Sequence, residues 1–280
     1  MDIDVIIMTM KRIIKKTCYF IMKLIHTIRW VLEILLKTDL KNHIIFDDKR
    51  CVINILANGP SLVEDIEKNN FEEGDCSVVN FFYKSPYFLK IKPCFYVIAD
   101  PYFFESEDSI KPIIDNVTWS MKLVIPYYAW KKYKILHNIP NEKIEVVPLH
   151  SINYSGFECI RHWAYRHGFA MPKAQNVLVA SIFNAVNSGY KEVRLYGADH
   201  SWTQTLGVNE MNQVCAIDSH FYDKEKVKYL PYNCMKMHEL LRAFAFMFES
   251  YHYLRHYADS RGCRILNCTK NSFIDAFERA

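Results

Sequence analysis

The chain has 280 residues, 50% of them apolar and 15% aromatic, so it is long enough to bury one large core or two modest ones. Residues 1–50 hold 10 Lys and Arg against 6 Asp and Glu, whereas residues 51–280 hold 25 of each. This neutral body argues against a nucleic-acid-binding surface.

Residues 11–37 contain neither Pro nor Gly and are predicted to form a basic amphipathic helix. Its apolar stripe follows 4-3-4-3 spacing and consists of Ile14, Cys18, Ile21, Ile25, Ile28, Leu32 and Leu35. Cations fall mainly on the other side: Lys11, Arg12, Lys15, Lys16, Lys23, Arg29 and Lys37. The uncharged runs are shorter than the ~20 residues that span a bilayer, and charges interrupt every candidate core of a signal peptide.

Two interpretations of this helix remain open. It could lie on the anionic inner surface of a bacterial membrane, which would make a cytoplasmic protein peripheral to the inner membrane. Alternatively, it could pack on the globular body or pair with its own copy in a homo-oligomer. We expect residues 1–45 to form this helix and a polar connector, and residues 46–280 to form the main domain.

Strand and helix patterns alternate over the main domain. Apolar runs predict strands within 52–58, 76–80, 95–100, 123–126, 144–148, 191–199 and 263–267. Helices are expected at 62–67, 176–188, 235–257 and 272–279. Strands separated by helices indicate an α/β fold, a Rossmann-like and mostly parallel sheet with helices on both faces.

Cysteine usage fits the interior of a cell. The nine cysteines form no Cys-x-x-Cys pair, and their number is odd. We therefore expect reduced thiols in a cytosolic protein, and no zinc site.

Polar residues end five of the predicted strands: Asn58, Asn80, Asp100, Asp199 and Asn267. The carboxyl ends of parallel strands share one edge of the sheet, where open α/β sheets bind ligands. At the first strand Asn58, Gly59, Pro60 and Ser61 form a tight turn into a helix, which predicts an anion site unless the turn is an ordinary connection. Segment 200–234 is aromatic and too long for a routine connection, which favours a lid.

These motifs resemble those of the bacterial sialyltransferases of the Campylobacter type, glycosyltransferase family 42, from about residue 50 onward. The matching strings are Asn58-Gly59-Pro60-Ser61, Asn80-Phe81-Phe82-Tyr83, Ala99-Asp100-Pro101 and Gly189-Tyr190-Lys191-Glu192-Val193-Arg194-Leu195-Tyr196-Gly197-Ala198-Asp199. The chain departs from the family at Asp100, where the family has Asn, and at Asn176-Val177-Leu178, where it has Thr-Ser-Gly. His200-Ser201-Trp202 replaces a Tyr that follows the last motif in the family.

The resemblance implies a GT-A-like enzyme that moves sialic acid or a related sugar, with inversion, from a CMP-sugar donor to a glycan or glycolipid hydroxyl. It would act in lipopolysaccharide or capsule biosynthesis. The resemblance implies that the donor contacts the following residues: Asn58, Gly59, Pro60, Ser61, Asn80, Asp100, Gly197, Ala198, Asp199 and His200. His238 or His220 would be the general base, because a neutral imidazole suits that role. Candidate donors to the leaving phosphate are Trp202, Tyr222 and Tyr232.

No cofactor and no metal are expected, because a nucleoside monophosphate leaving group carries less charge than a diphosphate. Similar Gly-Pro-Ser-Leu and Gly-x-Asp elements occur in hydroxymethylpterin diphosphokinases. This alternative predicts ATP and Mg²⁺ dependence, with Asp100 and Asp199 as candidate metal ligands. A non-catalytic binding module that keeps the fold is the third alternative.

Overall fold

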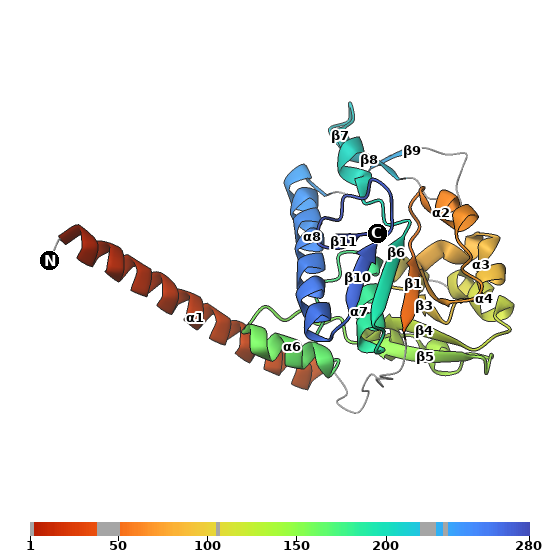
Figure 1. Cartoon of the computed structure of the whole chain (residues 1–280), viewed down its shortest axis with the longest axis horizontal. Coiled ribbons are helices and arrows are strands. Elements are labelled where there is room, and N and C mark those ends of the chain that lie inside the picture. Colours follow the sequence, from red (N-terminus) through yellow and green to blue (C-terminus); the bar gives the residue numbers. More distant parts are fainter. Residues whose placement is uncertain (1–2, 38–50, 105–106, 219–227, 232–234) are drawn as a thin grey trace.

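The computed structural model describes residues 3–37, 51–104, 107–218, 228–231 and 235–280. A large sheet lies between two layers of helices, and a long N-terminal helix projects from it (Figure 1). The strands of the large sheet are β1 Val52–Leu56, β2 Asp75–Val79, β3 Phe95–Val97, β4 Met121–Pro126, β5 Ile144–Leu149, β6 Glu192–Tyr196, β10 Arg264–Asn267 and β11 Glu278–Arg279. The α-helices are α1 Ile3–Lys37, α2 Leu62–Lys68, α3 Tyr87–Ile91, α4 Glu107–Asn116, α5 Tyr127–Lys132, α6 Glu158–Arg166, α7 Val177–Asn187 and α8 Met237–Ser260. Short 3₁₀ turns are η1 Asn80–Lys84, η2 Pro101–Phe104, η3 Lys134–His137 and η4 Ser201–Thr205.

The eight strands follow the order β11-β10-β6-β1-β2-β3-β4-β5, and every neighbouring pair is parallel. The α/β fold with a parallel sheet predicted from the sequence is therefore confirmed. From β1 the chain builds outward through β2 to β5, and then returns to place β6 on the other side of β1. The strand order thus reverses between β1 and β6, which is where such sheets open a crevice for a ligand.

Alternate residues of each strand point to opposite sides of the sheet, and both sides are buried because helices cover them. Ile55 belongs to a core with α7 and α8, and its neighbour Leu56 belongs to a second core with Leu62 and Ile113. Figure 1 shows α8 on one side of the sheet and α2, α3 and α4 on the other.

The helix α1 has 35 residues and packs on the body only through its second half, so its N-terminal half stands clear in Figure 1. The Lys23 ammonium donates to the carbonyl of Gly156 at 2.9 Å, and the hydroxyls of Thr27 and Tyr154 lie 2.8 Å apart. Trp30 is buried, with its ring 4.8 Å from that of Tyr154, and Ile34 is buried as well. We call Lys23, Thr27, Trp30 and Ile34 the body-facing side of α1.

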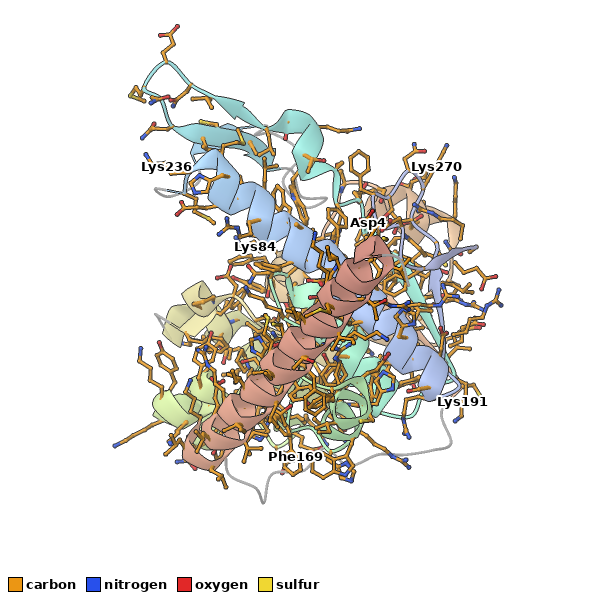
Figure 2. The ribbon with its side chains drawn as sticks, turned by 90° about the vertical axis from the view of Figure 1, so that its left-hand side faces the viewer. Asp4, Lys84, Phe169, Lys191, Lys236 and Lys270 are labelled. Carbon is orange, nitrogen blue, oxygen red and sulfur yellow. The ribbon has the colours of Figure 1, made fainter. Side chains whose placement is uncertain are left out.

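The predicted apolar stripe of α1 does not take part in this contact. All seven of its residues are exposed. At about 100° per residue, the stripe and the body-facing side lie on opposite faces of the helix. The second half of the helix thus packs on the body, as one of the alternatives from sequence has it, but it does so through the face opposite the predicted apolar stripe. Figure 2 views the molecule from the side of α1, which crosses its front. In the described ranges no helix is both long and apolar enough to cross a bilayer.

Segment 200–234 contains more regular structure than expected. After η4 it forms β7 Gly207–Val208, β8 Val214–Asp218 and β9 Lys228–Pro231, which pair antiparallel in a separate sheet. In Figure 1 this small sheet lies at the same end of the molecule as the first turn of α8. His220, Tyr222 and Tyr232 lie outside the described residues.

The helix predicted at 272–279 is wrong. Ser272, Ile274 and Ala276 are buried, whereas Phe273 and Asp275 between them are exposed. Such two-residue alternation belongs to extended chain, which here ends in the edge strand β11. Side-chain bonds hold this segment: the Asn267 amide donates to Ser272 Oγ at 3.0 Å, and Asn267 therefore serves the fold.

Candidate functional site

The residues that follow β6, β1 and β2 meet because these strands are neighbours in the sheet. Together with the first turn of α7 and with η4 they enclose a cavity of about 170 Å³, here called the strand-end cavity. Its lining consists of Ala57, Asn58, Gly59, Pro60, Val79, Asn80, Asn176, Val177, Leu178, Gly197, Asp199, His200, Ser201, Trp202 and Thr205. It therefore lies at the point where the strand order reverses, as expected for a ligand site of this fold.

Gly59 and Gly197 bring two stretches of backbone into direct contact under the cavity. The Gly59 N–H donates to the Gly197 carbonyl at 2.9 Å. A Cβ on Gly59 would lie 1.9 Å from Asp199 Oδ2, and one on Gly197, whose φ is +64°, would lie 2.8 Å from Leu62 Cβ. Both positions therefore require glycine, the second for its conformation as well as for space.

Asp199 places a carboxylate of the protein itself at the start of α2. Ser61 Oγ donates to Asp199 Oδ2 at 2.9 Å, and the Ser61 backbone N–H donates to the same carboxylate. Burial raises the pKa of Asp199, and the bonds from Ser61 offset part of that effect. A ligand phosphate would have to displace this carboxylate, so we expect this wall to accept an uncharged group such as a base or a ribose.

Three carboxamides supply the directional polar groups of the cavity. Asn58 donates through Nδ2 to the Val79 carbonyl at 3.1 Å, and its Oδ1 is buried without a hydrogen-bond partner among the described residues. Asn80 has a φ of 43° and accepts at Oδ1 from the Ala99 N–H at 3.3 Å. Asn176 caps α7 by accepting from the Leu178 N–H at 2.7 Å. Asn58 Oδ1 is thus a buried acceptor, in a residue that lines the cavity, whose hydrogen-bonding capacity no described residue uses.

His200 and Trp202 form the aromatic part of the wall. His200 is buried with φ 56°, and its Nε2 lies 2.6 Å from the Tyr251 hydroxyl. Burial lowers the pKa of His200 to about 3, so its ring is neutral at physiological pH. Its ring centroid is 4.6 Å from that of Trp202, and Trp202 stacks on Phe244 at 6.1 Å.

Most of the sequence-predicted donor residues come together in this cavity. Asn58, Gly59, Pro60, Asn80, Gly197, Asp199, His200 and Trp202 line it. Ser61 bonds to Asp199 from behind, and Ala198 is buried with its N–H donating to Thr269 Oγ1 at 2.9 Å. Asp100 does not line the cavity, and neither does His238, which is exposed in the first turn of α8.

Sequence reasoning missed some of the lining residues. Asn176 looked only like a departure from the family motif, although an Asn directly before an apolar helical run is a recognised N-cap signal. Ser201 and Thr205 follow His200 in a 3₁₀ turn with no signal of their own. Tyr251 was not found because it lies 51 residues from its partner His200.

No protein-family model matches the chain, and no curated protein matches it. Three solved structures are similar to it over most of its length. The MAf glycosyltransferase of Magnetospirillum magneticum AMB-1 is 14% identical with a TM-score of 0.48, and the match covers 85% of this chain and 35% of that one. The sialyltransferase CstII of Campylobacter jejuni, solved with cytidine-5'-monophosphate, is 17% identical with a TM-score of 0.41, over 82% and 84% of the two chains.

The alpha-2,3-sialyltransferase Cst-I of Campylobacter jejuni is 17% identical with a TM-score of 0.42, over 85% of this chain and 83% of that one.

Proposed function

We propose that the chain is a glycosyltransferase that moves sialic acid or a related sugar, with inversion, from a CMP-sugar to a hydroxyl of a glycan or glycolipid. The observation that carries this proposal is the meeting of Asn58, Gly59, Asn80, Gly197 and Asp199 around one cavity. These residues belong to the strings through which the sequence resembles the sialyltransferases, and they come from three separate strand ends.

The chemistry of the cavity suits a pyrimidine nucleoside. Cytosine presents an exocyclic amino donor, and the unpartnered Asn58 Oδ1 is an acceptor of the required kind. The Asp199 carboxylate suits ribose hydroxyl donors better than a phosphate, which would then point out of the cavity toward the acceptor.

In the proposed transfer, the acceptor oxygen attacks the anomeric carbon while the bond from that carbon to the donor phosphate breaks. A histidine takes the acceptor proton, and CMP leaves with the bonding electron pair. His238 and His220 remain the candidates for this base. His238 lies in the exposed first turn of α8, and the small sheet lies at the same end of the molecule (Figure 1). We propose that segment 200–234, which contains this sheet, is the lid. Trp202, Tyr222 and Tyr232 are proposed to stabilise the leaving phosphate without a metal.

Calorimetric titration with CMP, CDP, UDP and ATP tests the nucleotide. We expect CMP to bind most tightly, and CDP to bind about tenfold more tightly than UDP, because one unsatisfied hydrogen bond at a buried acceptor has roughly that effect. Tightest binding of ATP in the presence of Mg²⁺ would instead support the diphosphokinase alternative. Equal affinity for all four nucleotides would count against the proposal.

Turnover of a CMP-sugar in the same preparation separates an enzyme from a binding module. His238→Ala should leave CMP affinity unchanged and lower turnover about 10²- to 10⁴-fold if His238 is the base. Loss of turnover only in His220→Ala would assign the base to His220. If neither variant changes turnover, neither His238 nor His220 is the base.

We also propose that α1 attaches this enzyme to the inner face of a bacterial membrane. The apolar stripe is exposed on the side of α1 that faces away from the body, and Lys11, Lys15 and Arg29 lie beside it. An amphipathic helix with an apolar face and flanking cations is the pattern that binds anionic lipid surfaces.

A further inference from the structure

A second and larger cavity lies between α1 and the ends of β4 and β5. Its volume is about 820 Å³. One wall comes from the last turns of α1 with Arg29, Trp30 and Lys37, and the other from the body with Tyr127, Lys131 and Lys173. We call it the basic cavity, and neither the sequence motifs nor the proposed donor site accounts for it.

The charged residues that line the basic cavity are mostly cations. Arg29, Lys37, Lys131, Lys132 and Lys173 line it, against the single carboxylate of Glu33. That carboxylate is already paired with Lys37, at 2.6 Å. Arg29 and Lys131 form no ion pair with any described residue. In a chain whose residues 51–280 balance their charges, such a concentration of cations around one hollow indicates an anionic ligand.

The cavity also has uncharged features that suit an amphiphilic, sugar-bearing ligand. Tyr127 lines it with its ring 4.4 Å from that of His150, and the ring of Tyr128 is exposed beside it. The indole Nε1 of Trp30 is a buried donor with no hydrogen-bond partner among the described residues. Ligand sites typically combine such aromatic walls with a few polar donors.

The position of the basic cavity connects it to the donor site. Tyr127 directly follows β4, and His150 directly follows β5, so this cavity opens at the same carboxyl edge of the sheet as the strand-end cavity. Only β3 stands between β4 and β2 in the strand order. A small hollow of about 20 Å³ at the end of β3 includes Ala99 and shares Ser151 with the basic cavity.

The wall that α1 contributes to the basic cavity lies next to the apolar stripe, which we propose rests on lipid. At about 100° per residue, Arg29, Glu33 and Lys37 lie on the flank of the helix between the apolar stripe and the body-facing side. Leu36, which is 80% exposed, lines the cavity next to the stripe. With the stripe resting on lipid, the mouth of the basic cavity would be at the height of the headgroups.

We propose that the basic cavity is the acceptor subsite of the glycosyltransferase, and that it holds the phosphate or diphosphate group of a lipid-borne glycan acceptor. This inference rests on the proposed function. The cations neutralise the phosphate, the tyrosines contact the first sugar, and the lipid remains in the membrane beneath the stripe. The glycan then extends along the carboxyl edge toward the donor sugar.

Binding of inorganic pyrophosphate to the full chain, measured by calorimetry, tests the anion subsite. Lys131→Glu should weaken it about tenfold or more, because a charge-assisted bond to an anion is lost and a repulsion replaces it. Lys134→Glu is the matched control: it makes the same charge change three residues away, on an exposed side chain that does not line the cavity. We expect the control to change affinity less than about threefold. Equal loss in both variants, or no pyrophosphate binding by the wild-type chain, would overturn the proposal.

Vesicles distinguish a lipid-borne phosphate from a soluble one. The wild-type chain should bind phosphatidylcholine vesicles that carry phosphatidic acid, and Lys131→Glu should lower that binding several-fold more than Lys134→Glu does. If Lys131 matters for pyrophosphate but not for these vesicles, the acceptor is a soluble phosphate, and the lipid-borne part is wrong. CMP titration of each variant supplies the separate readout: unchanged CMP binding shows an intact fold and donor site, whereas absence of CMP binding in the wild-type chain refutes the proposed function instead.

Discussion

Gly59 sets how closely the turn after β1 can approach the end of β6. Its missing side chain leaves room for the Asp199 carboxylate and the Gly197 carbonyl. Gly59→Ala would place a methyl 1.9 Å from Asp199 Oδ2, so either the carboxylate or the turn must move. We expect a loss of about 1–3 kcal/mol in the free energy of unfolding, measured by denaturant titration, and a parallel loss of CMP affinity.

Gly262→Ala is the control for this prediction. Gly262 also has a positive φ, of +63°, but a Cβ there would meet nothing within 4 Å. We expect only the conformational strain of about 1 kcal/mol and unchanged CMP affinity. If Gly262→Ala impaired CMP binding as much as Gly59→Ala, close approach at the cavity would not be the reason that Gly59 is needed.

His200 gives the fold a dependence on acid. Because burial lowers its pKa to about 3, well below the ordinary value of 6.5, the folded state disfavours the charged ring. Its contribution to stability is therefore present above pH 6.5 and is lost as the pH falls from there toward about 3. His200→Asn removes the titration and keeps a residue that tolerates the left-handed backbone at φ 56°. Unfolding free energies measured across this pH range should fall less steeply in the variant.

Tyr251→Phe separates titration of His200 from the loss of its hydrogen bond. It removes the hydroxyl that lies 2.6 Å from His200 Nε2 but leaves the imidazole buried. We expect lower stability at every pH and a steep acid dependence like that of the wild-type chain. A pH profile as flat as that of His200→Asn would mean that the hydrogen bond, and not burial of the ring, sets the acid response.

For α1, the sequence pattern predicted the helix and its apolar stripe but not how the helix packs on the body. Its helical structure and the composition of its stripe followed from 4-3-4-3 spacing and the absence of Pro and Gly. Its docking did not, because the body-facing side includes polar residues such as Lys23 and Thr27, which gave no apolar signal. The helix thus has an apolar face and a body-facing side, and only the apolar face could be recognised without the structure.

Substitutions on the two faces of α1 should have separate effects. Ile25→Asp together with Leu32→Asp changes two exposed residues of the stripe, so binding to anionic vesicles should be lost while the free energy of unfolding stays within about 0.5 kcal/mol. Trp30→Ala removes a buried ring on the other face and should lower the free energy of unfolding by about 3–5 kcal/mol. Vesicle co-sedimentation and denaturant titration measure these effects. Vesicle binding that persists in the double variant would contradict the proposed role of the stripe.

At the scale of the whole molecule, the alternation of strands and helices predicted the fold class, and the polar strand ends predicted where a site would lie. Three of the five predicted residues, Asn58, Asn80 and Asp199, line the strand-end cavity. Asp100 and Asn267 do not line it, because β3 and β10 lie one strand further out, on either side of the group formed by β6, β1 and β2. This strand order cannot be read from local patterns. The basic cavity was missed for the same reason: its walls come from residues about a hundred positions apart.

The ribosome makes α1 well before it makes the residues of the body on which α1 packs. Thr27 bonds to Tyr154, which lies 127 residues later in the chain. At typical synthesis rates, the ribosome needs about 6 to 25 seconds to add those residues. During that interval the body cannot cover its side of the helix, so we expect the nascent chain to reach the lipid surface before the body has folded.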